Sequence, residues 1–145
     1  MRSKLSVLPL RRALLAAAFA AGIGIGATAI GAETLGTLSG AQEVPPVKTA
    51  ASGRSGISVK SDMSVTGTID TSGIAGTAAH IHSGASGTNG PVVVTLTKTA
   101  DARWSVPPGT MLTAEQYKRY RAGDLYVNVH SDMYPNGEMR LQLKP

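Results

Sequence analysis

The sequence predicts an all-β fold, a Greek-key antiparallel β-sandwich with one short helix near residues 113–121. In several short runs after residue 33, apolar side chains recur at every second position, which is the period of a half-buried strand. Gly and Pro separate these runs at fairly regular intervals, as they do in sandwiches of many short strands. The chain has 145 residues and no cysteine, so we expect one domain with one core and no disulfide.

Residues 1–32 have the three parts of a cleaved signal peptide. Four basic residues and no acidic residue occupy the first twelve positions, an apolar Ala/Leu/Gly stretch follows, and small residues lead to Ala32. We expect cleavage after Ala32, with cleavage after Ala29 as the alternative. An uncleaved anchor is the competing interpretation, since residues 13–32 are about long enough to span a bilayer, but their four glycines disfavour it. The domain at 33–145 is therefore expected to be periplasmic or extracellular.

Charge argues against a nucleic-acid partner. The net charge of +5 falls to +1 once residues 1–32 are removed, because ten basic and nine acidic residues remain. Binding to nucleic acid needs a clustered basic patch, and the one basic cluster of the predicted mature chain, residues 118–121, is typical of a solvated helix end. After signal cleavage we also expect no membrane association.

The predicted elements follow from residue type and periodicity. Strands are expected at 33–40, 56–60, 63–70, 77–82, 92–96, 124–130 and 138–143. Two prolines exclude residues 42–47 from a central strand, and the Gly/Ser-rich segment 52–56 is expected to be a turn. Loops are expected at 83–90, at 131–137 and, around Trp104, at 99–109. Thr113 suits an N-cap, so a helix should run from it to Arg121 and end at Gly123.

The alternation within three strands places all three histidines of the chain on strand faces. In 124–130 the core face carries Leu125, Val127 and Val129, so His130 points outward. His80 and His82 lie two residues apart and therefore share one face of the strand at 77–82. If 124–130 and 138–143 form a hairpin, Glu138 lies opposite His130 on the outer face.

This pattern predicts a surface metal site with His80, His82 and His130 as ligands. Imidazole is the commonest biological metal ligand near neutral pH, and a nitrogen-rich site suits copper first and zinc second. Glu138 is then expected to orient an imidazole through its carboxylate. Met133 is a candidate axial ligand. Glu43 is either an additional ligand or, as we prefer, an anchor that accepts backbone N–H bonds in its loop.

Five motifs, taken in order, resemble one known family. They are QEVPP at 42–46, AAHIH at 78–82, GPVV at 90–93, GDLYVNVH at 123–130 and PNGEMR at 135–140. Together they identify residues 34–143 as similar to the CHRD domain, named for chordin and widespread in exported bacterial proteins. Some bacterial members look like copper-binding periplasmic proteins. The matching positions that the resemblance implies for such a role are His80, His82 and His130.

Two functions from different classes follow. The first is a non-enzymatic exported protein that binds a copper or zinc ion. The second is an extracellular protein-interaction or matrix module, with another exported protein as its partner, in which the histidines and Glu138 form a structural hydrogen-bonded cluster. A metalloenzyme ranks third, because it requires an open coordination position. No Gly-x-Ser-x-Gly nucleophile elbow is present to suggest a serine hydrolase.

Overall fold

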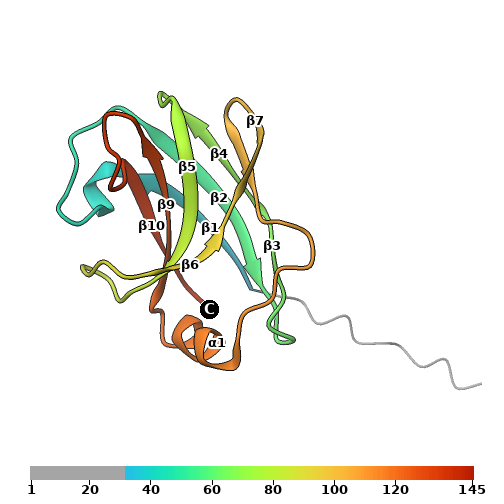
Figure 1. The fold of residues 1–145 in the computed structure, drawn as a ribbon. Helices are drawn as coiled ribbons and strands as arrows, with labels where there is room; N and C mark the ends of the chain where they lie inside the picture. Colours follow the sequence, from blue (N-terminus) through green and yellow to red (C-terminus); the bar gives the residue numbers. More distant parts are fainter. Residues whose placement is uncertain (1–31) are drawn as a thin grey trace, which may run out of the picture.

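The computed structural model describes residues 32–145, which form an antiparallel β-structure with one short α-helix (Figure 1). The strands are β1 (Ala32–Ser39), β2 (Ser52–Val59), β3 (Val65–Thr66), β4 (Thr68–Ser72), β5 (Gly76–Ser83), β6 (Val92–Thr95), β7 (Thr97–Ala100), β8 (Arg103–Ser105), β9 (Leu125–Ser131) and β10 (Met139–Leu143). A 3-10 turn, η1, spans Gly40–Gln42, and the helix α1 spans Ala114–Arg121. The predicted all-β class with one short helix is confirmed. The predicted signal peptide, apart from Ala32, lies outside the described residues.

The described strands belong to a single sheet that curls until its two ends meet. Its order is β6-β5-β9-β10-β1-β2-β4-β8-β7, with β3 paired to β2, and every pairing is antiparallel. The two end strands, β6 and β7, are separated only by Leu96, whose N–H donates to the carbonyl of Ala79 in β5 at 2.9 Å. The sheet is therefore nearly closed, and β5, β9 and β10 face β2 and β4 across the interior (Figure 1).

The core lies between these two walls. Val127 and Val129 of β9 pack there with Ile57 of β2, Ile69 of β4 and Trp104 of β8, all of them buried. The core face predicted for residues 124–130 is therefore confirmed. On β10, Met139 and Leu143 are fully buried, whereas Leu141 is only half-buried.

The helix begins and ends as its sequence indicates. The side chain of Thr113 accepts a hydrogen bond from the backbone of Gln116, whose side chain bonds back to the backbone of Thr113. This reciprocal pair satisfies two donors that a helix start leaves free. Gly123 follows the helix with φ +79, a left-handed conformation that favours glycine. No helix within residues 32–145 is long and apolar enough to cross a membrane.

Two segments predicted as turns or loops are strands. Residues 52–56 are the first half of β2, because β1 and β4 pair with them from both sides. Gly53 favours this close packing, since a Cβ there would lie 3.3 Å from Cε of Met139. The segment 99–109 contains most of a hairpin, in which β7 pairs with β8. In both segments, tertiary pairing outweighs a weak local β-propensity.

Candidate metal centre

The candidate centre lies on the outer face of β5 and β9, opposite the core. The register of these strands pairs His82 with Tyr126, His80 with Asn128, and Ala78 with His130. Residues two apart on a strand share a face, and directly paired residues lie side by side. The pairing therefore brings the histidines of β5 next to the histidine of β9, although His82 and His130 are 48 positions apart in the chain.

The three imidazoles converge. One nitrogen from each of His80, His82 and His130 lies within 4.8 Å of the others, and these three form a group suited to a metal ion. Nδ1 of His80 lies 3.0 Å from Nε2 of His130. Ligand nitrogens sit about 2.0–2.1 Å from a zinc ion, so two nitrogens 3.0 Å apart can share one ion at adjacent coordination positions.

Backbone carbonyls hold two of the rings. Nδ1 of His82 lies 2.9 Å from the carbonyl of Gly90, and Nδ1 of His130 lies 3.0 Å from that of Pro135. A carbonyl only accepts, so each Nδ1 carries the proton and each Nε2 keeps its lone pair. Ligating histidines commonly use their second ring nitrogen in this way, because the bond fixes the tautomer and the ring orientation.

Contrary to the sequence-based expectation, the centre is largely buried. His82 is 8% exposed and His130 is 9% exposed, while His80 is half-buried. Loop residues cover this face of the sheet: the 84–90 loop contacts β9 and β10, and the amide of Asn89 donates to the carbonyl of Val44 at 2.7 Å. Strand alternation correctly separates the core face from the other face, but it does not show that loops cover the second face.

Burial keeps the imidazoles in their neutral form. Desolvation is the largest cause that lowers the pKa of His80, His82 and His130. The neighbouring histidines lower the pKa of His80 and His130 further. Neutral imidazole is the form that coordinates a metal, so at neutral pH a proton competes weakly for these nitrogens.

Tyr126 and Arg140 extend the cluster across the sheet. The ring of Tyr126 stacks on that of His82, with centroids 4.9 Å apart and planes at 4°. The guanidinium carbon of Arg140 lies 3.4 Å from the centroid of Tyr126. Because β9 lies between β5 and β10, the tyrosine ring is held between the imidazole and the guanidinium. The sequence did not predict either role, although alternation along β9 and β10 puts both residues on this face.

Arg140 also fixes the loop that holds His82. It is 1% exposed, and its guanidinium donates to the carbonyls of Thr88 and Ala85 at 2.9 and 3.2 Å. The same loop ends at Gly90, whose carbonyl accepts from His82. Charge-assisted bonds of this kind are among the stronger ones in proteins, so Arg140 acts on the centre through the loop.

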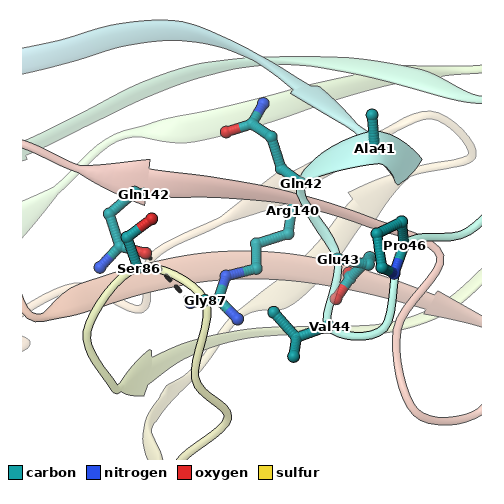
Figure 2. Close-up of a pocket in the computed structure, with 9 residues that line it drawn as sticks. All are labelled: Ala41, Gln42, Glu43, Val44, Pro46, Ser86, Gly87, Arg140 and Gln142. Atoms are coloured by element: carbon teal, nitrogen blue, oxygen red, sulfur yellow. Dashed lines mark hydrogen bonds between the residues drawn. The ribbon is translucent and has the colours of Figure 1, made fainter.

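Glu43 lies beside Arg140, outside the group of three histidines. Figure 2 shows it beside Arg140 in a hollow that Val44, Pro46 and Gln142 also line. Desolvation raises the pKa of Glu43 to about 7, against the opposing effects of Arg140, the Val44 backbone and the Asn128 side chain. Oε1 of Glu43 is buried and has no hydrogen-bond partner among the described residues, so the expected anchoring of the loop stays a prediction. The carboxylate is not a member of the three-histidine group.

The two remaining candidates lie elsewhere. The carboxylate of Glu138 accepts hydrogen bonds from the hydroxyls of Thr49 and Ser131, at 2.6 and 2.5 Å. His130 is oriented instead by the carbonyl of Pro135, so the expectation that Glu138 orients an imidazole is wrong. Met133 is 79% exposed in the loop after β9. A solvent position of this kind does not suit an axial ligand to buried imidazoles.

Fold and site together define a small all-β protein with a loop-covered cluster of three histidines on the outer face of its sheet. The family model of the CHRD domain matches residues 35–143, nearly all of the described chain. The protein belongs to the CHRD domain family. Comparisons with curated proteins and with solved structures found no match.

Proposed function

We propose that this protein is an exported, non-enzymatic metal-binding protein that holds one copper or zinc ion through His80, His82 and His130. One observation carries the proposal: Nε2 of His82 is buried and has no hydrogen-bond partner among the described residues. A buried polar atom without a partner costs on the order of 1–3 kcal/mol, and a coordinated ion would remove that cost.

The chemistry of the donor set supports the same conclusion. The three rings are neutral near pH 7, two of them present Nε2 lone pairs, and the donor atoms already lie within 4.8 Å of one another. Imidazole donors suit copper and zinc. Export is inferred from the signal-like sequence at residues 1–32, and the CHRD family membership agrees with it.

The test is a titration of the protein, purified from its own compartment, with Cu(II) and with Zn(II). We expect one ion per chain and a higher melting temperature. A ligand at about a thousand times its dissociation constant adds roughly 4 kcal/mol to the free energy of unfolding. The triple variant His80→Ala, His82→Ala, His130→Ala should lose this gain. Asp132→Ala, which removes an exposed carboxylate near β9, should keep it and serves as the control.

The second candidate function rests on a specific observation: His80 and His130 lie within hydrogen-bond distance of each other, at 3.0 Å. In an interaction module, the cluster would be structural, and this hydrogen bond would be part of what holds it together. This function is favoured if metal leaves the melting temperature unchanged and the triple variant unfolds. Substrate turnover by the metal-loaded protein would contradict the non-enzymatic assignment.

A further inference from the structure

We infer that the side-chain oxygen of Asn128 is a fourth donor to the ion, so that the centre offers three nitrogens and one oxygen. This inference rests on the proposed function and extends it to the coordination of the metal. Asn128 is 2% exposed, and its Oδ1 has no hydrogen-bond partner among the described residues. Four buried side-chain atoms of the described residues have no hydrogen-bond partner, and two of them, Oδ1 of Asn128 and Nε2 of His82, belong to this face of β5 and β9.

The strand register places Asn128 in the middle of the histidines. It pairs directly with His80 across the β5–β9 ladder and precedes His130 by two residues on the same face of β9. Directly paired residues have Cβ atoms about 4.5–5.5 Å apart. His82 is the diagonal neighbour of Asn128 in this ladder, since it pairs with Tyr126. A donor at this position therefore reaches the space that the three rings surround.

The carboxamide nitrogen of Asn128 is the atom on the side of Glu43. A Cβ built on Gly137 would lie 2.7 Å from Oε1 of Glu43 and 2.8 Å from Nδ2 of Asn128, so both atoms lie close to this glycine. An amide nitrogen suits a neighbouring carboxylate better than an amide oxygen does, because only the nitrogen donates. Oδ1 is the atom on the other side of the carboxamide.

An oxygen donor has consequences for metal choice. Carboxamide oxygen is a harder ligand than thiolate or thioether, so three imidazoles with one such oxygen favour Zn(II) and Cu(II) over Cu(I). Four protein donors also complete a tetrahedral set, as in closed zinc sites that bind an ion without turnover. Asn128 thus links the coordination of the centre to the proposed non-enzymatic role.

Affinity measurements on the full-length protein test the inference. Zn(II) is titrated against a chromophoric chelator for the wild type, for Asn128→Ala and for Asn136→Ala, which changes an exposed asparagine in the neighbouring loop. We expect Asn128→Ala to weaken binding at least 10- to 100-fold, the loss seen when groups supporting a metal site are removed. The control should change it less than twofold. Equal affinities for the wild type and Asn128→Ala would overturn the inference and leave the three-histidine site in place.

A second measurement needs no variant of Asn128. Protein labelled with ¹³C-asparagine and loaded with Cu(II) should show a ¹³C hyperfine coupling by electron–nuclear double resonance, as expected for a carboxamide bound through its oxygen. An unlabelled sample is the control. Absence of this coupling in a protein that binds Cu(II) overturns the inference even if Asn128→Ala fails to fold. Failure of the wild type to bind either ion overturns the proposed function as well.

Discussion

At the scale of the single residue, Glu43 is the described residue whose pKa burial shifts most. It is 5% exposed, and burial raises the pKa of its carboxyl group from 4.5 to about 7. The unfolded chain ionises this group near pH 4.5, so between pH 4.5 and 7 the folded state binds more protons than the unfolded state. The contribution of Glu43 therefore favours folding below pH 4.5 and is lost as the pH rises through 7.

Replacing Glu43 by Gln should stabilise the protein at pH 8. The substitution keeps the shape of the side chain and removes the buried charge, so the free energy of unfolding should rise by up to roughly 3 kcal/mol, at 1.36 kcal/mol per pKa unit. At pH 4.5 the gain should largely disappear. Urea unfolding of metal-free protein at both pH values measures this difference, with Glu115→Gln on the exposed side of α1 as the control. A gain of equal size at both pH values would contradict the account.

Individual residues were predictable where one rule decided their position. The alternation of apolar side chains was enough to place His80, His82 and His130 on strand faces, because a strand has only two faces. The roles of Asn128 and Arg140 were not predictable in the same way. Both depend on loops that cover the outer face, and a strand pattern carries no information about what a distant loop will cover.

At the scale of the element, β9 differs from an ordinary half-exposed strand because all seven of its residues are buried. One face contributes to the core, and the other lies under the loops that hold the histidines. The loop from β9 to β10 takes part in this cover. Its Gly137 has φ +122 and lies directly over Glu43 and Asn128.

Gly137→Ala should damage both stability and the centre. A Cβ there would lie 2.7 Å from a carboxylate oxygen and 2.8 Å from an amide nitrogen, in a backbone conformation that L side chains rarely adopt. We expect a loss of about 2–4 kcal/mol in the free energy of unfolding and weaker Zn(II) binding.

Gly87→Ala is the matched control for this change. Gly87 also has positive φ, at +78, but a Cβ there would meet nothing within 4 Å. It should therefore cost only the backbone strain, about 1–2 kcal/mol, and leave Zn(II) binding unaltered. Similar losses for the two variants would show that backbone conformation alone, and not the contact over Glu43 and Asn128, sets the cost. Thermal unfolding with and without Zn(II) separates the two results.

The elements were predictable where local chemistry was strong. The capping residue Thr113 and the closing Gly123 set the ends of α1, and the β-branched run at Val92–Thr95 forms β6. The hairpin of β7 and β8 was missed because all four residues of β7 are exposed and show no alternation. These residues become a strand through pairing with β8, which a local pattern does not contain.

At the scale of the whole molecule, the curled sheet should give a graded pattern of local stability. β9 is hydrogen-bonded on both sides, to β5 and β10, and is buried throughout, whereas β7 is exposed and pairs on one side. We expect the amides of β9 to exchange with solvent only on global unfolding, and those of β7 to exchange through local opening. Hydrogen exchange followed by NMR measures both. Faster exchange in β9 than in β7 would contradict this prediction.

The sequence predicted the fold class because strand periodicity and Gly/Pro spacing act along the whole chain. It did not predict how nearly the sheet closes. Closure depends on Leu96, before which the chain pairs with β5 and after which it pairs with β8. Nothing in the residues around Leu96 marks this change of partner, so only the observed pairing reveals it.

This change of partner at Leu96 bears on how the protein behaves when it is crowded. The terminal strands of a sheet present backbone groups onto which a second molecule can add a strand, a route to aggregates and fibrils. Here β6 and β7 have only four residues each, and β7 carries the charge of Lys98. Short and charged terminal strands are poor templates for such growth, so strand addition at β6 or β7 is disfavoured.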